Sequence, residues 1–338
     1  SRSGPTGAEP PAGVHGAEPP CVCLDNLTLM ASSPQPGPAG VRVRVPAKIN
    51  LALKVGAPRA DGYHPLATVY QAVSVYDEVH AAWADPDEFE VVVSGEGADL
   101  VPLDDSNLAV RAAKLLARTH GPHDSLGASL SIKKAIPVAG GLAGGSANGA
   151  AALLACAVLW NLDVTAEGLR ALAAELGSDV PFALLGGTAV GSGRGEDVAP
   201  ALARGTYHWV LAFGYHGLST ATVYRRFDEL SPRAAPPTVP PDLMNALRSG
   251  DPRLLGPALS NDLEPAALDL QPRLRTVLQT GLEYGALGAL VSGSGPTCAF
   301  LVDDEAAAVD LSVSLSAEGL CRAVRRATGP VTGARVVN

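Results

Sequence analysis

The chain has 338 residues, which is enough for two domains and a large buried core. Its formal net charge is −9, which argues against a general nucleic-acid-binding protein. No apolar run approaches the roughly 18 uncharged residues that a membrane-spanning helix needs, so we expect no membrane association. The 5 cysteines show no metal-ligand spacing beyond one Cys-x-Cys near the start, which favours a reduced, cytoplasmic protein.

The first 40 residues are rich in proline and glycine and have no sustained hydrophobic period. This composition predicts a disordered N-terminal extension over residues 1–40. The segment has neither the basic region nor the long apolar run of a signal peptide. Met30 is a plausible alternative start, in which case residues 1–29 would be an upstream extension.

A first unit, predicted to span residues 41–198, mixes strands and helices. Alternating apolar residues and β-branched runs predict its strands at 41–45 with a continuation over 51–55, 69–76, 88–94, 129–133 and 188–191. Apolar residues at helical spacing predict helices at 107–119, with Ser106 or Asn107 as the N-cap, and at 165–176. A short helix is expected to open at 177–182, with Ser178 as its cap and Asp179 in its first turn.

A second unit is predicted over residues 199–338. Its expected strands lie at 209–213, 289–292, 298–302 and 334–337, and its expected helices at 221–230, 243–247, 273–284 and 304–318. Strands and helices do not alternate regularly in either unit. The chain is therefore predicted to form two α+β domains rather than a doubly wound parallel sheet.

A glycine-rich segment, residues 137–148, runs directly into a predicted helix with apolar residues at positions 150, 153, 154, 157 and 158. Ser146 is the expected N-cap of that helix. Free amides beside the positive end of a helix dipole form a natural phosphate site. The alternative is a tight loop whose glycines only permit positive φ.

Two common nucleotide signatures do not fit this loop. The pattern G-x-x-x-x-G-K-[ST] fails because no lysine or arginine occurs between Lys134 and Arg170. The dinucleotide pattern G-x-G-x-x-G fails because residue 142 is leucine. A cation for bound phosphate must therefore come from elsewhere in the chain.

Smaller groups of residues also have the chemistry of a binding site. Lys48 and Asn50 share one face of the first strand, although a lysine there can simply face solvent. Asp179 can carry chemistry or only complement a helix dipole. Tyr63 and His64 can belong to an ordinary turn, and the glycines of 291–298 can form a tight β-turn or a second cluster of backbone donors.

Taken together, three motifs resemble those of the GHMP kinase superfamily, in order and spacing, over residues 41–338. They are P-x-K-x-N-L at 46–51, P-x-x-x-G-L-x-G-G-S-A at 137–147 and S-G-S-G-P-T at 292–297. Further segments are similar to the family of kinases that phosphorylate 4-diphosphocytidyl-2-C-methyl-D-erythritol. These segments are 59–64, 177–182, 193–196, 219–224 and 261–264. One departure is Gly145-Ser146, where many superfamily members have two serines.

The resemblance implies a two-domain GHMP kinase fold, with an N-terminal ribosomal-protein-like ATP-binding domain and a C-terminal α+β sandwich domain for the substrate. It also implies ATP-dependent phosphorylation of the C2 hydroxyl of the methylerythritol unit, in non-mevalonate isoprenoid biosynthesis. Asp179 would accept the hydroxyl proton and Lys48 would stabilise the emerging charge. Mg²⁺ would travel with ATP, and no metal-ligating residue of the protein is expected.

By the same resemblance, the binding residues fall into two sets. The ATP contacts would be Asn107, Pro137, Val138, Ala139, Gly140, Gly141, Leu142, Ala143, Gly144, Gly145, Ser146 and Ala147. The substrate contacts would be Asn50, Tyr63, His64, Gly293, Ser294 and Gly295. Amides of 141–147 are expected to donate to phosphate, and a side chain on Gly144 to fill the phosphate volume. No aromatic for stacking on cytosine stands out in the second unit, where Tyr215 or His216 can take that place.

The expected partner is the small-molecule substrate, without nucleic acid or membrane, and the protein is expected to be a monomer or a weak homodimer. Two alternatives stay open. One is another GHMP kinase, of the homoserine or mevalonate type, although mevalonate kinases lack the Asp-Gly-Tyr-His element of 61–64. The other is a catalytically silent relative that only binds a ligand, for which the Lys48 and Asp179 pair would be unnecessary.

Overall fold

The computed structural model of the protein describes Ser1 and residues 40–121 and 126–337. The extension predicted over residues 1–40 and the alternative start at Met30 therefore lie outside the described residues, apart from Ser1 and Gly40. Within the described part, no helix is both long enough and apolar enough to cross a membrane.

The first sheet is built around two long antiparallel strands, β1 (Val41–Val55) and β2 (Leu66–Trp83). Its order is β12-β1-β2-β4-β3, with β3 (Phe89–Gly95) parallel to β4 (Ala128–Lys134) and β12 (Arg335–Val337) at the edge. Three short strands join off this path: β5 (Thr188–Ser192), β6 (Asp197–Pro200) and β8 (Ser260–Asn261). The two predicted segments 41–45 and 51–55 form one strand, because every residue from 45 to 53 is buried and bulges absorb the irregularity.

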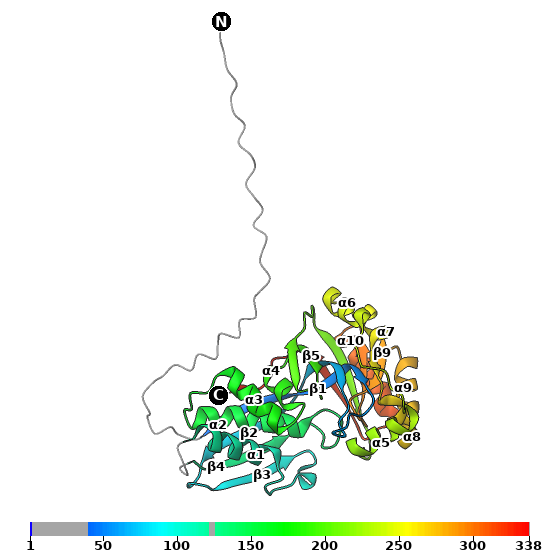
Figure 1. Ribbon diagram of the computed structural model, residues 1–338. Coiled ribbons are helices and arrows are strands. Elements are labelled where there is room, and N and C mark those ends of the chain that lie inside the picture. Colours follow the sequence, from blue (N-terminus) through cyan, green and yellow to red (C-terminus); the bar gives the residue numbers. More distant parts are fainter. Residues whose placement is uncertain (2–39, 122–125, 338) are drawn as a thin grey trace. The chain divides into compact units, whose positions relative to one another are not determined.

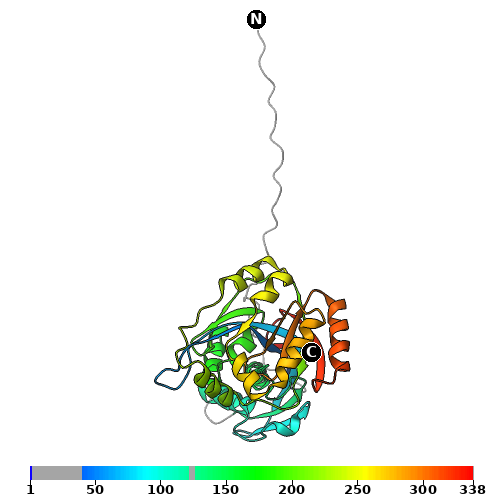
Figure 2. The ribbon, with the colours of Figure 1, turned by 90° about the vertical axis from the view of Figure 1, so that its right-hand side faces the viewer.

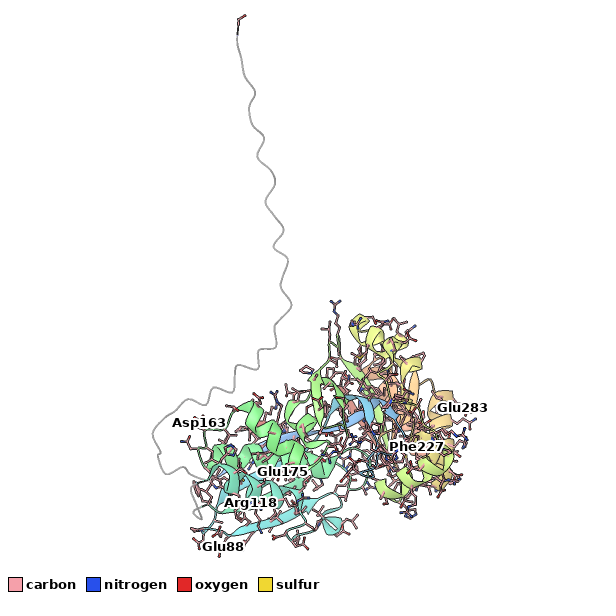
Figure 3. The ribbon with its side chains drawn as sticks, viewed as in Figure 1. Glu88, Arg118, Asp163, Glu175, Phe227 and Glu283 are labelled. Carbon is pink, nitrogen blue, oxygen red and sulfur yellow. The ribbon has the colours of Figure 1, made fainter. Side chains whose placement is uncertain are left out.

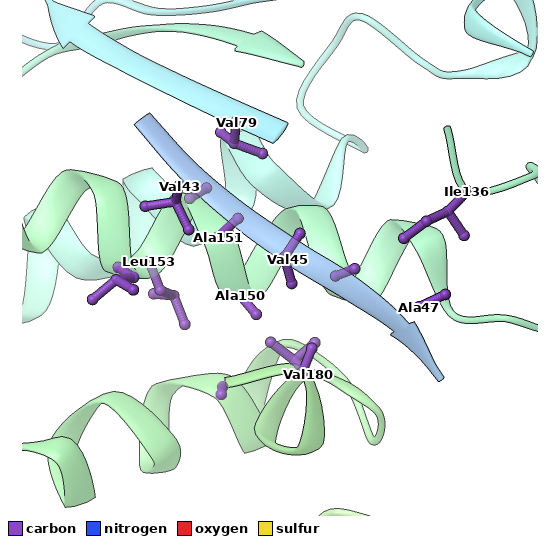
Figure 4. Packing of buried hydrophobic residues seen from close by; sticks show 14 of the residues in the cluster. Val43, Val45, Ala47, Val79, Ile136, Ala150, Ala151, Leu153 and Val180 are labelled. Carbon is purple, nitrogen blue, oxygen red and sulfur yellow. The ribbon is translucent and has the colours of Figure 1, made fainter. Parts of the chain in front are cut away.

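Helices cover one face of this sheet (Figure 1). They are α1 (Leu108–His120), α2 (Gly144–Leu159), α3 (Ala166–Leu176) and α4 (Val180–Leu185). Alternate residues of β1, Val43 and Val45, point toward Ala150 and Leu153 of α2, with Val180 of α4 beside them (Figure 4). Helix α2 is buried on all sides from residue 147 to 157, so the single apolar face predicted for it was too narrow.

The second sheet is fully antiparallel, in the order β11-β7-β10-β9. Its strands are β7 (Tyr207–Phe213), β9 (Gly288–Val291), β10 (Cys298–Val302) and β11 (Ala323–Gly329). The helices of this half are α5 (Thr220–Leu230), α6 (Pro241–Ser249), α7 (Pro252–Ala258), α8 (Glu264–Leu270), α9 (Arg273–Glu283) and α10 (Glu305–Ala317). In Figure 2 the right-hand side of Figure 1, where this half lies, is turned toward the viewer. In Figure 3 the labelled Phe227 and Glu283 belong to it, and Glu88, Arg118, Asp163 and Glu175 belong to the first half.

The two sheets are joined through β2. The indole N–H of Trp209 donates to Oε1 of Gln71 at 2.9 Å, and both side chains are buried. Strands β8 and β12 come from the second half of the chain but pair with β1. The α+β class is therefore confirmed, whereas the boundary between residues 198 and 199 stays a prediction.

The elements that the sequence missed are short or weakly patterned. Helix α7 contains Gly256 and Pro257, and β11 alternates poorly because Arg325 and Arg326 are both exposed. Strand β6 and helix α8 have 4 and 7 residues, too few for a clear period. The 3₁₀ turn η2 (Ala98–Leu100), with 3 residues, was missed for the same reason.

Candidate functional site

A cleft of about 1150 Å³ contains most of the predicted site residues. Its walls come from β1, β2, the glycine-rich loop, the start of α4, helix α5 and the loop between β9 and β10. The predicted residues that line it are Lys48, Asn50, Tyr63, His64, Asn107, Pro137, Val138, Ala139, Gly140, Gly141, Ala143, Gly144, Gly145, Ser146, Asp179, Gly293, Ser294 and Gly295. Leu142 and Ala147 do not line the cleft, because both are buried in the hydrophobic core.

Lys48 and Asp179 meet in this cleft. The Lys48 ammonium lies 3.5 Å from Oδ2 of Asp179, with the two side chains 9% and 29% exposed. Asp179 is the N-cap residue of α4 and its side chain makes no capping bond, so it is free to face the cleft. The predicted Ser178 cap and the placement of Asp179 inside the first turn were wrong by one position, because the helix begins at Val180.

A chain of hydrogen bonds holds Lys48 in place. Its ammonium donates to Oδ1 of Asn50 at 2.7 Å, and the amide of Asn50 donates to Oγ1 of Thr68 at 2.8 Å. The Thr68 hydroxyl donates in turn to the carbonyl of Ala52 at 2.7 Å. Lys48 and Asn50 therefore share one face of β1, as predicted. A Cβ added to Gly293 would lie 3.6 Å from the Lys48 nitrogen, which shows how closely the β9–β10 loop approaches this pair.

The glycine-rich loop leads into α2 as predicted, but the helix begins earlier. Ala143 is the N-cap, with φ of 57° and no side-chain cap, and Gly144 is the first helical residue. Ser146 is thus the third residue of the helix rather than its cap. The first-turn amides of Gly144, Gly145 and Ser146 have no acceptor within the helix and lie at its positive end. The amide of Ala147 is not available, because it donates to the carbonyl of Ala143 at 2.9 Å.

The loop is fastened to the second half of the molecule. Gly141 has φ of +75°, and a Cβ there would lie 2.2 Å from the carbonyl oxygen of Ser292. The Ser292 hydroxyl donates to the carbonyl of Gly141 at 3.1 Å. A glycine is therefore required at 141 both by the backbone conformation and by the close approach of the two loops.

The two glycines at the start of α2 have different surroundings. A Cβ on Gly144 would lie 3.1 Å from both Cγ2 of Ile136 and the ammonium of Lys134. A side chain at residue 144 would therefore press against Ile136 and Lys134, and the expectation that it fills the phosphate volume stays a prediction. A Cβ on Gly145 would meet nothing within 4 Å, and Gly145 lines the cleft.

A buried ionic network lies beneath the glycine-rich loop and was not predicted from the sequence. Lys134 forms an ion pair with Asp77, and its ammonium also donates to Oδ1 of Asn148 at 3.1 Å. Oδ1 of Asp77 accepts from the amides of Ala135 and Ile136 at 2.7 and 2.8 Å. The network thus ties the end of β4 to the first turns of α2. Lys134 also lines the cleft. A cationic side chain therefore lies beside the glycine-rich loop, although the loop itself contains no lysine or arginine.

Asn107 lines the cleft, and both the oxygen and the nitrogen of its side-chain amide already make a hydrogen bond. Its oxygen accepts from the amide of Ala109 at 2.9 Å, which makes it the N-cap of α1. Its amide nitrogen donates to the carbonyl of Pro102 at 2.7 Å. Of the two caps predicted for this helix, Asn107 is confirmed.

The end of the cleft near α5 is rich in aromatic rings. Nε2 of His64 lies 2.7 Å from Oδ1 of Asp228, which requires a proton on that nitrogen and leaves Nδ1 of a neutral ring as an acceptor. The ring centroid of Tyr224 is 4.9 Å from that of His64. Arg194 stacks at 4.9 Å over Tyr63, which is 54% exposed.

The aromatic residues proposed earlier for stacking on a base do not lie in this cleft. Tyr215 and His216 line a separate cavity of about 250 Å³, where Arg273 lies 4.8 Å above the Tyr215 ring. Tyr224 does line the main cleft. The segment 219–224 drew attention to it only through its resemblance, because a tyrosine in a predicted helix otherwise suggests a packing residue.

Two tyrosines, Tyr70 and Tyr224, lie near the carboxylate of Asp179. Burial, the charge of Asp179 and a hydrogen bond to Asp179 raise the pKa of Tyr70 well above its usual value. Burial and the same charge also raise the pKa of Tyr224. Both phenols therefore stay protonated at neutral pH, so they can donate to an anion. Tyr70 lies within the predicted strand 69–76 and gave no signal of its own in the sequence.

The described residues contain no group of three or more histidine, cysteine, aspartate or glutamate side chains that could hold a metal ion.

Comparisons with known proteins place this arrangement in a family. The model of the GHMP kinases N terminal domain matches residues 107–187, and that of the GHMP kinases C terminal domain matches residues 243–319. A 4-diphosphocytidyl-2-C-methyl-D-erythritol kinase of Mycolicibacterium gilvum is 56% identical over 302 residues, covering 88% of this chain and 92% of the relative. One of Thermobifida fusca is 54% identical over 306 residues, covering 89% and 99%.

A solved structure agrees with these relatives. The crystal structure of a 4-(cytidine 5'-diphospho)-2C-methyl-D-erythritol kinase superimposes with a TM-score of 0.69 at 33% identity, covering 85% of this chain and 98% of that one. The resemblance based on the three motifs and the predicted two-domain GHMP kinase fold are both confirmed. The chain belongs to the GHMP kinase superfamily and, within it, to the 4-diphosphocytidyl-2-C-methyl-D-erythritol kinase family.

Proposed function

We propose that this protein transfers the γ-phosphoryl group of ATP to the C2 hydroxyl of 4-diphosphocytidyl-2-C-methyl-D-erythritol. The observation that carries the proposal is the meeting of Lys48 and Asp179 at 3.5 Å in a cleft that the glycine-rich loop also lines. The relatives at 54–56% identity carry the name of this kinase, which supports the choice of substrate.

The reaction needs a base, because the tertiary hydroxyl is a poor nucleophile while it keeps its proton. The hydroxyl oxygen bonds to the γ-phosphorus as the bond from that phosphorus to the bridging oxygen of ADP breaks. The proton passes to the carboxylate of Asp179, and the Lys48 ammonium stabilises the charge that develops beside it. Positioning and charge neutralisation supply most of the rate in such a loose transition state.

The phosphates of ATP would lie at the start of α2. The first-turn amides of Gly144, Gly145 and Ser146 are aligned with the helix dipole and open to the cleft. Mg²⁺ would arrive with the nucleotide and neutralise phosphate charge, since the described residues form no metal-ligand cluster of their own. Asn107 would border the adenine end through its backbone and α1, because its side chain is already bonded.

The cytidine end of the substrate would lie among the aromatic rings near α5. Tyr63 and Tyr224 provide faces on which a base can stack, and Nδ1 of His64 can accept a hydrogen bond. Asn50, Gly293, Ser294 and Gly295 would contact the part of the substrate next to Lys48. The domain limits 41–198 and 199–338, the cytoplasmic location and a monomeric or weakly dimeric state complete the proposal.

A direct assay separates this function from its rivals. The protein would be incubated with ATP, Mg²⁺ and 4-diphosphocytidyl-2-C-methyl-D-erythritol, and phosphorus NMR would be followed for a new phosphate monoester and for ADP. Homoserine and mevalonate would be offered in parallel. Turnover of either with the methylerythritol compound inert would reassign the substrate, and no ADP release with any of the three alcohols would favour a silent relative.

A further inference from the structure

Arg194 lies in the turn that joins β5 to β6, and its conformation is fixed by several hydrogen bonds. Residues 193–196 form this turn, in which the amide of Gly195 donates to the carbonyl of Ser192 at 2.8 Å. Both carboxylate oxygens of Glu196 contact Arg194. Oε2 accepts from its backbone amide at 2.6 Å, and Oε1 accepts from its Nε at 3.3 Å. The guanidinium therefore has a defined direction, although the side chain is 36% exposed.

The turn is attached to the segment that carries Tyr63. Strand β2 begins at Leu66, three positions after Tyr63, and the amide of Leu66 donates to the carbonyl of Gly193 at 2.8 Å. The guanidinium carbon of Arg194 lies 4.9 Å from the centroid of the Tyr63 ring, which is within the range of a cation–π contact. Tyr63 and Arg194 both line the cleft.

The backbone of Tyr63 is held more firmly than its ring. Its amide donates to Oδ1 of Asp61 at 3.0 Å, and its carbonyl accepts from the amide of Arg59 at 2.8 Å. Among the described residues, Arg194 is the one partner that forms a ring-stacking or cation–π contact with the Tyr63 ring. Without Arg194 the exposed ring could change rotamer, and a base that stacks on it would have to order it on binding.

We infer that Arg194 is a positioning residue, which holds the Tyr63 ring in place for the cytosine base of the substrate. The inference rests on the proposed function, in which the cytidine end of the substrate lies at this part of the cleft. The guanidinium covers one face of the ring, and the other face remains for the base. Because Arg194 orders the ring before the substrate arrives, less side-chain entropy is lost on binding.

The test is Arg194→Ala, with cytidine, CMP and CDP as competitive inhibitors against the methylerythritol substrate at saturating ATP. The three inhibitors share the base and differ in their phosphate groups. An unfixed ring should weaken all of them to the same extent, by about three- to tenfold, with the same rise in KM for the substrate. The loss should appear in KM rather than in kcat. A loss that grows from cytidine to CDP would mean that Arg194 contacts phosphate, and would overturn the inference.

A double-mutant cycle tests whether Arg194 acts through Tyr63. In the Tyr63→Ala background, Arg194→Ala should add no further loss of affinity, and an equal loss in both backgrounds would overturn the inference. The matched control is Arg44→Ala. Arg44 lies 5.2 Å from the centroid of Tyr76 and pairs with Glu78 at 3.3 Å, which is the same set of contacts outside the cleft. The inhibition constants of this control should equal those of the wild type.

Two further outcomes separate the inference from the function on which it rests. Tighter binding of cytidine by Arg194→Ala would mean that the guanidinium covers the face that the base uses, and would overturn the inference alone. Failure of CDP to inhibit the wild-type protein would overturn the proposed cytidine end of the cleft itself. Thermal unfolding of each variant shows whether the fold is retained.

Discussion

The ammonium of Lys48 lies 3.5 Å from the carboxylate of Asp179, although the two residues come from opposite ends of the first half of the chain. Lys48 is on β1, the first strand of the sheet, and Asp179 precedes α4 on the helical layer that covers it. Helix α2 packs on both β1 and α4, so the helix that carries the proposed phosphate site is held by the same elements as the ion pair. This packing therefore fixes the position of the ion pair relative to the glycine-rich loop.

Removal of either partner should abolish most of the turnover. Asp179→Ala removes the proposed base and Lys48→Ala removes the charge beside it, so each is expected to lower kcat by about 10²- to 10⁴-fold. ATP binding should persist, because its proposed donors are amides of α2. Coupled ADP release gives kcat, and titration with a fluorescent ATP analogue gives the affinity. Lys133→Ala, at an exposed lysine of β4, is the matched control and should keep wild-type values.

The adjacent glycines at the start of α2 give a paired test of the phosphate site. Gly145→Val places a side chain in open space within the cleft and should raise KM for ATP at least about tenfold, with little change in unfolding temperature. Gly144→Val drives the same side chain against Ile136 and Lys134 and should mainly cost stability, by about 1–3 kcal/mol. An unchanged KM in Gly145→Val would move the phosphates away from this helix end.

The sequence predicted that Lys48 and Asp179 belong to one site and that the glycine-rich loop leads into a helix, because each lies in a short motif with its own backbone geometry. Lys48 and Asn50 are two positions apart, so they lie on the same face of a strand. The glycines of residues 137–148 indicate a loop that leads into the start of a helix. The caps predicted at Ser178 and Ser146 were each misplaced, because Asp, Ser and Gly are all accepted next to a helix start and the sequence does not show which residue is the N-cap.

Residues whose contacts depend on elements far away in the sequence could not be predicted in this way. Tyr70, Asp77 and Lys134 belong to ordinary strands in the sequence, where an aromatic or a charged residue usually packs or faces solvent. Only the pairing of β2 with β4 brings Asp77 under Lys134, and only the packing of α4 on the sheet brings Tyr70 to Asp179. Long-range register of this kind is not encoded in local spacing.

The buried network beneath the loop should contribute strongly to stability. In Asp77→Asn the Lys134 ammonium loses its counter-charge while both side chains remain at most 2% exposed. Breaking one partner of a buried ion pair costs about 3–5 kcal/mol, so urea denaturation should show a loss of that order. Asp105→Asn is the control: its pair with Lys114 is exposed, and the loss should stay below about 0.5 kcal/mol. Equal losses in the two variants would contradict this account.

The buried thiol of Cys156 should make the protein less stable at alkaline pH. Burial raises its pKa from 9.0 to about 12, so the unfolded chain releases this proton at lower pH than the native protein. The contribution is therefore fully present below about pH 9 and is lost between about pH 9 and 12, by up to about 1.4 kcal/mol per pH unit. Cys156→Ala should remove this part of the slope. The free energy of unfolding of both proteins across this range measures it, and parallel curves would exclude the thiol as a cause.

The contact between His64 and Asp228 should determine affinity for the cytidine substrate and not for ATP. The hydrogen bond to Asp228 keeps the proton of a neutral His64 ring on Nε2 and leaves Nδ1 as an acceptor, which we propose that the substrate uses. Asp228→Ala removes the partner that fixes both the orientation of the ring and its tautomer. We expect KM for the methylerythritol substrate to rise about tenfold, with KM for ATP unchanged. Glu229→Ala, at the next residue of α5, should leave both constants unchanged, because among the described residues Glu229 forms its ion pair with half-exposed Arg226. A rise in KM for ATP alone would place the nucleotide, rather than cytidine, at this end of the cleft.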